Sequence, residues 1–435
     1  MSLPPADSGW DAGADAGVGG GGDSGTPDAG PVDAGTRDAG QDAGVACLSG
    51  EAATLRACLQ EGTSPDDCVD RFTAPLCDSD GDGVGDDLES ALAREYAPVF
   101  ATNGGGCGGN AETDWASNVN HFVTHAQVFF RPSDGGSDVL VDGAPTLATL
   151  PEESFWTGAT ERFANDPAVG SGAALYLCLT DTTGSTGVRV ESEAAMLALP
   201  DGVDVTTVVQ PANGPLAVSD HLMVSYQLFF AYNAFASPLD NHEGDWEGVI
   251  VFINRMTGGV DAAFFGRHDT TDSTTFVDTA TYPVRDPVTP VPACNTDVNH
   301  SEPAYHGLRF QDFNGLRHHL VAFVSTGSHA MYDYPANTYV VQKFGIGVRD
   351  THDGDGPWLD LAGGQLLSGG GALPVHFVWR NPGQLGALRE AWAGFRGQWG
   401  CQVGGIANSW PGPWGNDLHP RPELTRAWGS PPTAP

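Results

Sequence analysis

The sequence has very little positive charge. Its 435 residues contain 19 Lys and Arg against 55 Asp and Glu, for a formal net charge of −36, and Lys343 is the only lysine. Binding to nucleic acid, or electrostatic docking on an anionic membrane, requires clusters of basic side chains. The composition therefore argues against both functions, and it favours solubility and cation binding.

Signals for membrane insertion and export are also missing. No apolar run reaches transmembrane length. The first residues, Met-Ser-Leu-Pro-Pro, have neither the basic start nor the apolar segment of a signal peptide. We expect that a leader is absent from this chain. The protein would then be secreted, or be a bacterial cell-surface or outer-membrane lipoprotein.

The cysteines form no C-x-x-C pair, which disfavours a zinc site or a thioredoxin-type redox motif. An even number of cysteines at wide spacing fits disulfides made in an oxidising compartment. We expect disulfides among all eight: Cys47, Cys58, Cys68, Cys77, Cys107, Cys178, Cys294 and Cys401.

The first 77 residues divide into two segments. Residues 1–46 repeat Asp-Ala-Gly and cannot bury enough apolar area to offset their ordering entropy, so we expect a disordered linker. Residues 47–77 hold four cysteines and two short helical patterns, the second beginning at Pro65. We expect a helical hairpin with two disulfides. Of the three possible pairings we favour Cys47–Cys77 with Cys58–Cys68.

Residues 78–89 match the loop of a calcium-binding EF-hand. Gly83 permits the sharp turn, and no second EF-hand pairs with this loop. We therefore expect a structural calcium site; the alternative is an acidic, solvated linker. The predicted ligands are Asp78, Asp80, Asp82, the carbonyl of Val84, Asp86 and Glu89.

Residues 90–420 read as a β-sandwich domain, followed by a C-terminal tail at 421–435. A helix begins near Leu88 and ends before Pro98. Apolar runs separated by Gly, Pro, Asn and Asp then predict strands, and a late helix is expected over 385–395. The runs are 122–130, 222–232, 246–253, 320–325 and 375–379. The predicted fold is mostly β, with a small disulfide-rich helical module and a disordered tail before it.

The motif at 241–247, Asn-His-Glu-Gly-Asp-Trp-Glu, opens the strand at 246–253. Alternation along a strand points Asp245 and Glu247 to the same side. A turn just upstream can fold His242 over the two carboxylates. One imidazole and two carboxylates suit calcium or magnesium better than zinc. The alternative is a hydrogen-bonded polar cluster that caps the strand.

Three other segments carry polar or aromatic side chains of interest. His329 follows the strand at 320–325 and can line the same rim together with Glu243, or can simply bond a carbonyl. Ser328 beside it invites a nucleophile interpretation, but no Gly-x-Ser-x-Gly elbow is present. The acidic residues at 350–355 can bind a cation, although an exposed turn is the simpler interpretation. The late tryptophans can form a sugar or lipid platform, or pack on the sandwich: Trp399, Trp410, Trp414 and Trp428.

Four motifs in one order resemble the vacuolar-protein-sorting "sixty-two" family. The resemblance spans roughly residues 88 to 416 and implies architecture more than chemistry. Its motifs are Tyr-Ala-Pro-Val at 96–99, His-Glu-Gly-Asp-Trp-Glu at 242–247, Gly-Ser-His-Ala-Met-Tyr at 327–332 and Phe-Arg-Gly-Gln-Trp-Gly at 395–400.

A second, local resemblance is to the necrosis- and ethylene-inducing-like cytolysins, whose Gly-His-Arg-His-Asp-Trp-Glu motif binds a divalent cation. His242, Asp245 and Glu247 keep the ligand spacing, while Gly244 replaces the family's second His. The strand at 226–233 looks like the one that brings an upstream Asp, and it places Asn233 there. The resemblance implies a cation, calcium or magnesium, at the rim of a β-sandwich.

The sequence supports three hypotheses about function. The first is a secreted or surface-anchored, calcium-binding β-sandwich whose rim site binds a membrane lipid or glycan. The second is a metal-dependent hydrolase with Glu243 or His329 as base. The third is a structural surface protein without catalysis. The sequence identifies no protein partner and does not decide whether the protein is an enzyme.

Overall fold

The computed structural model describes most of the chain between residues 51 and 400. Contacts divide the chain into residues 1–45 and 46–435, and every described residue belongs to the second unit. The predicted linker at 1–46 and the tail at 421–435 lie outside the described residues. The described ranges are 51–72, 76–78, 81–105, 115–132, 137–150, 174–179, 202–212, 220–233, 242–266, 276–286, 305–311, 316–343, 346–366, 372–379, 390–395 and 397–400.

Two short helices form the predicted hairpin: α1 (Ala52–Gln60) and α2 (Pro65–Asp70). Ser64 caps α2, since its Oγ accepts a hydrogen bond from Asp67 N at 3.2 Å. A disulfide joins Cys58 to Cys68 with a Cα–Cα distance of 5.8 Å. The inner disulfide of the predicted nested pairing is therefore confirmed. Cys77 and Cys178 are disulfide-bonded as well, and the other four cysteines lie outside the described residues.

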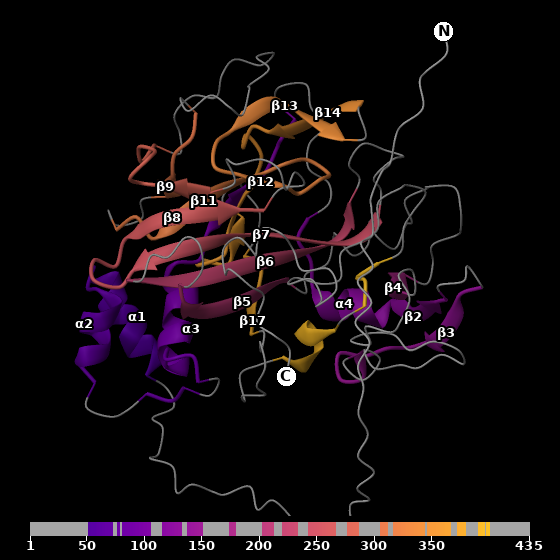
Figure 1. The fold of residues 1–435 in the computed structure, drawn as a ribbon, viewed down its shortest axis with the longest axis horizontal. Coiled ribbons are helices and arrows are strands. Elements are labelled where there is room, and N and C mark those ends of the chain that lie inside the picture. The colour runs from indigo at the N-terminus through magenta and orange to yellow at the C-terminus, as the bar shows by residue number, and fades with distance from the viewer. Residues whose placement is uncertain are drawn as a thin grey trace, which may run out of the picture. The chain divides into compact units, whose positions relative to one another are not determined.

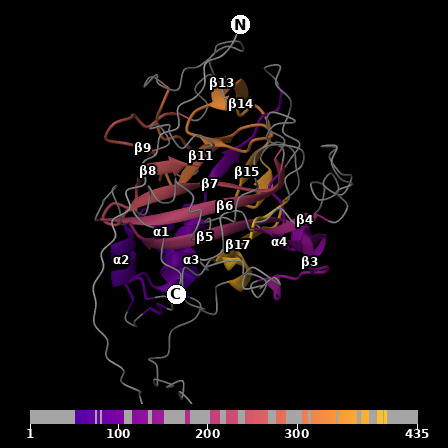
Figure 2. The same ribbon diagram turned by 45° about the vertical axis from the view of Figure 1, so that its right-hand side comes forward.

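Helix α3 (Asp86–Glu95) begins inside the calcium-loop motif and ends three residues before Pro98, as the sequence predicts. Its apolar face carries Leu88 and Leu92, which are buried in the main core. Tyr226 Oη donates a hydrogen bond to Ala93 O at 3.1 Å, which ties the helix to the large sheet. The helices α1, α2 and α3 lie together beside one end of that sheet (Figure 2).

The large sheet has six strands in the order β17-β5-β6-β7-β8-β9 (Figure 1). Its neighbours are antiparallel except β17 and β5, which are parallel. The longest strands, β6 and β7, have thirteen residues each and pair from His221↔Asn254 to Asn233↔His242. The bounds are β17 (Val375–Trp379), β5 (Val203–Pro211), β6 (His221–Asn233), β7 (His242–Asn254), β8 (Val260–Phe265) and β9 (Phe276–Asp278).

A second sheet packs against one face of the first. Its order is β10-β11-β1-β15-β16, with β12 paired to the side of β11, and β1 runs parallel to β11. Alternate residues of β6 and β7, such as Val224 and Val251, share one core with Ala322 of β11 and with Leu92 of α3. These two sheets form the predicted β-sandwich. The bounds are β10 (Phe310–Gln311), β11 (His319–Val324), β12 (Met331–Tyr332), β1 (Val99–Ala101), β15 (Trp358–Asp360) and β16 (Gln365–Leu366).

A smaller assembly covers the other face of the large sheet at the end opposite the helices (Figures 1 and 2). A three-stranded sheet in the order β3-β2-β4 shares a second core with Trp246 and Trp399. The hairpin of β13 and β14 completes the described strands. The bounds are α4 (Val119–Thr124), β2 (Ala126–Arg131), β3 (Val139–Asp142), β4 (Ala174–Leu179), β13 (Ala336–Lys343), β14 (Ile346–His352) and the 3-10 helix η1 (Ala391–Gly394).

Two local predictions were wrong or incomplete. The predicted strand at 122–130 is helix α4 followed by strand β2, because Asn118 caps a helix turn by accepting from His121 N at 3.0 Å. Of the helix expected at 385–395, the described residues form the 3-10 helix η1. No helix among the described residues has the length and apolarity needed to span a bilayer.

Candidate functional site

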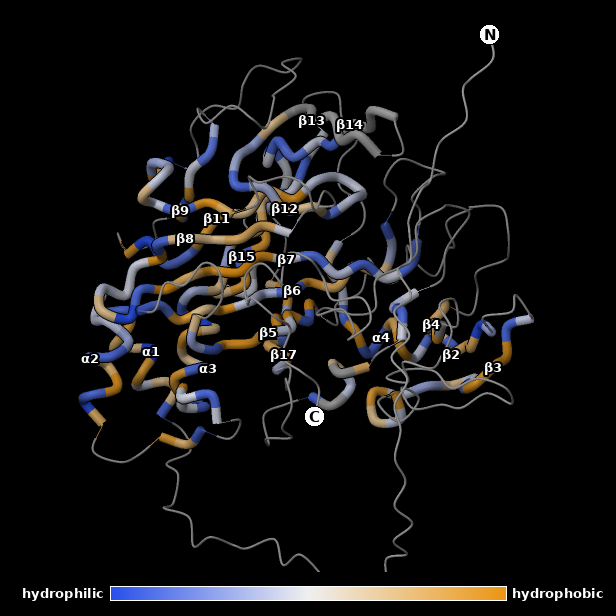
Figure 3. Tube along the Cα trace, viewed as in Figure 1, coloured by the Kyte–Doolittle hydropathy of each residue, from blue (hydrophilic) through white to orange (hydrophobic). Residues whose placement is uncertain are grey.

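The motif at 242–247 lies on strand β7 itself. We had expected a turn that folds this side chain over the carboxylates; that expectation was wrong, because the strand already begins at His242. Instead, His242 Nδ1 lies 3.2 Å from the neighbouring carbonyl oxygen of Glu243. The hydropathy colouring marks the motif as the hydrophilic end of an otherwise hydrophobic strand (Figure 3). All the charged side chains of the motif are buried, from 0% to 4% exposed, so the site is enclosed and is not an open rim.

The Gly-Gln-Trp-Gly segment at 397–400 packs directly on this motif. Gly244 has a φ of 59°, and a Cβ there would overlap the carbonyl oxygen of Trp399. A Cβ on Gly400 would likewise overlap the backbone of Glu243. The ring centroids of Trp246 and Trp399 are 5.4 Å apart in an edge-to-face arrangement. The two glycines therefore permit close backbone contact, and Trp399 is buried as a packing residue.

The Gly-Ser-His-Ala-Met-Tyr segment at 327–332 reaches the same strand through His329. The Nδ1 of His329 lies 3.1 Å from Asp245 Oδ2, with both residues at most 1% exposed. The imidazole stacks on Phe230 of β6 at 3.9 Å between centroids and an interplanar angle of 4°. Three of the four motifs behind the family resemblance thus meet on β7.

The backbone of His329 has a φ of 56°, which is rare for a residue with a Cβ. Two hydrogen bonds hold this turn: His329 N donates to Ser325 O, and Ser325 N donates to Ala330 O, both at 3.0 Å. Met331 N then donates to Gly266 O at 2.6 Å, which attaches the turn to the end of β8. A conformation of this kind costs about 1–3 kcal/mol and is typically found where the surrounding structure requires it. The turn is therefore built to aim His329 at Asp245.

Asn233 and Glu247 complete the surroundings of Asp245. Asn233 Nδ2 donates to Asp245 Oδ2 at 3.2 Å, so this oxygen accepts bonds from both Asn233 and His329. Glu247 Oε2 lies over Gly266, where a Cβ would come within 2.9 Å of it. The predicted site residues Asn233, Asp245 and His329 are therefore in contact. Glu247 lies against the residue to which the His329 turn is attached.

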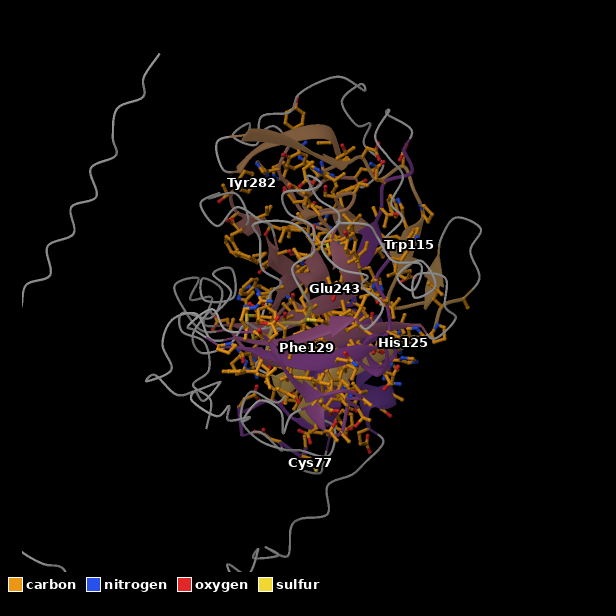
Figure 4. The ribbon with its side chains drawn as sticks, turned by 90° about the vertical axis from the view of Figure 1, so that its right-hand side faces the viewer. Cys77, Trp115, His125, Phe129, Glu243 and Tyr282 are labelled. Atoms are coloured by element: carbon orange, nitrogen blue, oxygen red, sulfur yellow. A yellow bond between two sulfur atoms is a disulfide. The ribbon has the colours of Figure 1, made fainter. Side chains whose placement is uncertain are left out.

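Glu243, the other residue predicted at this site, has a different neighbour. Its Oε2 accepts a hydrogen bond from Leu179 N of β4 at 2.9 Å. Figure 4 labels Glu243 and also Phe129, which lies on β2, the strand that pairs with β4 in the small sheet. Glu243 thus links the large sheet to the small one, and it contacts a backbone amide.

The geometry around His242, Asp245 and Glu247 bears on whether they can bind a cation. Within the part of the chain that the structure describes, no three His, Cys, Asp or Glu side chains converge as metal ligands would. His242 bonds to its own strand, and Asp245 is engaged by an amide and an imidazole. The arrangement fits a hydrogen-bonded carboxylate–imidazole pair better than a metal centre. A cation at this site stays a prediction.

Ser328, weighed as a nucleophile, points to a carboxylate. Its Oγ donates to Asp350 Oδ1 at 2.7 Å. Ser325 Oγ and Tyr332 Oη also donate to this carboxylate. Asp350 is fully buried on β14, so this part of the acidic segment is not the exposed turn we had expected. The Ser328 contact is structural: three hydroxyls stabilise one buried charge.

The predicted calcium loop has a defined backbone around its acidic side chains. Asp78 accepts from Gly81 N at 2.7 Å and from Gly83 N at 3.0 Å, and Asp82 accepts from Val84 N at 2.7 Å. The φ values of Gly81 and Gly83 are 74° and 91°, which only glycine adopts without strain.

The loop ends in the first turn of α3, where Asp86 and Glu89 lie. The carboxylates and the Val84 carbonyl are the hard oxygen donors that calcium takes, but among the described residues of the loop no three acidic side chains converge on one point, so calcium stays a prediction here as well. Asp80 lies outside the described residues.

A cleft of about 700 Å³ opens beside this loop. Its lining includes Asp66, Asp70 and Asp78, and also Arg255, whose Nε lies 3.0 Å from Asp66 Oδ1. The cleft leaves Asp78 accessible to ions from solvent.

Sequence reasoning missed the residues that support His329. The stacking of Phe230 and the bond to Asp245 join positions far apart along the chain, and no local pattern reports either contact. Comparisons with protein-family models, with curated proteins and with solved structures found no match.

Proposed function

We propose that this protein is an extracellular, calcium-stabilised β-sandwich protein that acts as a binding module. The observation that carries the proposal is the geometry of the loop at 78–89. Asp78 accepts two glycine amides across the loop, and α3 delivers Glu89 at the position of the closing ligand. Without a cation, acidic residues this dense in the sequence repel one another. A bound calcium offsets that repulsion and joins the helical hairpin to α3.

The disulfides support an extracellular location. Cys58 and Cys68 are bonded to each other within a helical hairpin, and Cys77 and Cys178 each take part in a disulfide. Disulfides of this kind persist in secreted, periplasmic and surface proteins and are rare in the cytosol. We propose secretion, or attachment to a bacterial surface as a lipoprotein.

We propose that the buried Asp245–His329 pair positions the recognition site of the module. Support comes from the convergence of the motifs at 242–247, 327–332 and 395–400 on β7, and from the strained turn that positions His329. We also propose, from the four motifs of the sequence, that the protein is related to the vacuolar-protein-sorting "sixty-two" family. The net charge of −36 disfavours an anionic ligand, so we propose a glycan or a neutral lipid headgroup.

These proposals can be tested by measuring the calcium content of three proteins and their binding to glycans and lipids. Elemental mass spectrometry on wild-type protein, Glu89→Ala and Asp245→Ala should find that Glu89→Ala alone loses a calcium ion. Glycan arrays and neutral lipid vesicles should then show weakened binding by Asp245→Ala. An unchanged calcium content in Glu89→Ala would contradict the calcium proposal. Unchanged binding by a folded Asp245→Ala protein would contradict the recognition proposal.

A second candidate function is a hydrolase, favoured by the Asp245–His329 pair itself. A buried carboxylate that orients an imidazole is the supporting part of many acid–base sites. His329 is then the base, because Glu243 is engaged by a backbone amide. Ester and glycoside substrate panels at several pH values test this function. Turnover that His329→Gln abolishes supports it, and equal turnover by both proteins rejects it.

A further inference from the structure

Three loops meet at one edge of the second sheet. Strands β1 and β11 are parallel, so their carboxyl ends share an edge. The segment 102–105 follows β1, and the His329 turn follows β11. Strand β15 is antiparallel to β1, so the segment 353–357, which precedes β15, reaches the same edge. The topology therefore brings the acidic segment between β14 and β15 against the loop after β1.

The contacts between these loops are close and specific. Gly104 N donates to Asp355 Oδ1 at 2.5 Å, and Gly356 N donates to Thr102 O at 2.9 Å. A Cβ on Gly356 would come within 2.7 Å of the Asn103 carbonyl carbon. Asn103 Nδ2 also donates to Thr326 Oγ1 at 2.8 Å, which connects the loop after β11. The segment 353–356 is therefore fixed on both sides, and its acidic side chains have defined positions.

Asp353 is the unusual residue in this segment. Its side chain is 3% exposed, and Oδ1 accepts from Asp355 N at 3.2 Å. Its Oδ2 is buried and has no hydrogen-bond partner among the described residues. A buried carboxylate oxygen without a donor is costly, so a native structure that retains one needs a reason.

The neighbour of Asp353 makes this cost larger. The Asp353 side chain is also in hydrogen-bonding contact with the Asp355 carboxyl. Carboxylates only accept hydrogen bonds, so two that touch require a proton or a cation between them. Asp355 is exposed to solvent, so an ion can approach the pair from outside.

We propose that Asp353 and Asp355 bind a divalent cation, with calcium as the preferred ion. Two carboxylates supply its charge, and water on the exposed side of Asp355 completes its coordination. Calcium suits the site because it accepts oxygen ligands in irregular number and geometry. The site has two carboxylates, so it differs from a cluster of three acidic or imidazole ligands. It is also separate in sequence and in structure from the loop at 78–89, and it does not depend on the proposed function.

Trp358 provides a direct reporter for this ion. Its Nε1 donates to the carbonyl oxygen of Gly354, the residue between the two carboxylates, at 2.8 Å. Terbium replaces calcium at oxygen sites and emits light when a nearby indole is excited. Terbium bound by Asp353 and Asp355 is therefore sensitised by Trp358.

The test uses the full chain and terbium as the probe. Wild-type and Glu89→Ala proteins should show terbium emission on indole excitation, and calcium should displace it. Trp358→Phe should lose this emission but keep its calcium stoichiometry by calorimetry. Asp353→Asn should lose both the emission and one calcium ion per chain. Asp355→Asn, altered at an exposed position, should show the same losses, and circular dichroism will verify that each variant is folded.

Two results overturn the proposal. Asp353→Asn and Asp355→Asn proteins that are folded and keep the wild-type emission and stoichiometry show that the pair shares only a proton. Emission that survives in Trp358→Phe but disappears in Glu89→Ala places the terbium in the loop at 78–89.

Discussion

The imidazole of His329 and the carboxylate of Asp245 meet at 3.1 Å although 84 residues separate them along the chain. Asp245 lies on β7, and His329 lies in a turn whose φ of 56° is unusual for histidine. Neither side chain is more than 1% exposed. Their contact attaches the β11–β12 turn to the large sheet, so the pair supports both packing and the proposed recognition site.

Removal of the imidazole should destabilise the fold. His329→Ala leaves Asp245 buried with a weakened set of donors and removes the stacked partner of Phe230. We expect the free energy of unfolding to fall by about 3 kcal/mol, measured by urea denaturation. His329→Asn should lose less, because asparagine tolerates a left-handed backbone and keeps a donor. Met256→Ala, at a residue 68% exposed, is the control and should change stability by less than about 0.5 kcal/mol. Equal stability of His329→Ala and the control would contradict the role of the pair.

The close approach of Gly244 to Trp399 predicts a second sensitive position. A Cβ at Gly244 would overlap the Trp399 carbonyl, and the φ of 59° adds strain for any other residue. Gly244→Ala should therefore cost at least about 2 kcal/mol. The matched control is Gly143→Ala, whose Cβ would find its nearest neighbour at 3.8 Å. Thermal unfolding compares the two, and a similar melting temperature for both variants would contradict the packing described.

Local patterns predicted the elements of the fold well. The apolar runs of β6 and β7, the helical hairpin and the Cys58–Cys68 pairing all follow from short-range chemistry. The strand predicted at 122–130 was wrong in its first part. Helix α4 forms there because a single side chain, that of Asn118, caps it, and the hydrophobic pattern does not indicate this cap.

The candidate site was predictable only as separate pieces. Asp245, Asn233 and His329 were each singled out, yet their contact depends on sheet register and on the β11–β12 turn. Expectations for His242 failed because β7 extends to that residue, where pairing with Asn233 fixes its backbone. Asp350 was expected in an exposed turn, but hydroxyls from the β11–β12 turn and from β12 allow it to be buried. Hydrogen bonds between polar groups that are far apart along the chain produce no local pattern in the sequence.

A pH dependence is expected from Asp204, which is 5% exposed. Burial raises the pKa of Asp204, against the opposing effects of Val119 N at 2.8 Å and His376 Nδ1 at 3.0 Å. With the folded pKa above the unfolded value of about 3.9, the folded state binds the proton more tightly. The contribution of Asp204 to the free energy of unfolding is therefore complete below its pKa in the unfolded state, and it is lost as the pH rises through its pKa in the folded state.

The measurement compares wild-type protein with Asp204→Asn, which has no carboxyl proton to lose. The difference in unfolding free energy, wild type minus variant, should fall as pH rises above about 4. Urea denaturation at several pH values gives this difference. The same comparison, made in proteins that also carry His376→Gln, separates the effect of the Asp204 carboxyl from that of the His376 imidazole. A difference that rises with pH would contradict the raised pKa of Asp204.

Calcium removal should destabilise the protein through the loop at 78–89. An ion that binds only the folded state stabilises it by about 2.7 kcal/mol at a hundredfold excess over its dissociation constant. We expect EGTA to lower the melting temperature of wild-type protein, and expect a smaller effect in Glu89→Gln, which lacks the charge of the closing ligand.

The matched control for that experiment is Glu61→Gln, because Glu61 is an exposed carboxylate in the same helical module. Its response to EGTA should equal that of wild type. In an Asp353→Asn background, the remaining response to EGTA should come from the loop alone, so adding Glu89→Gln should remove it. A wild-type melting temperature that EGTA leaves unchanged would show that the loop keeps its shape through the bonds of Asp78 to Gly81 and Gly83, without help from an ion.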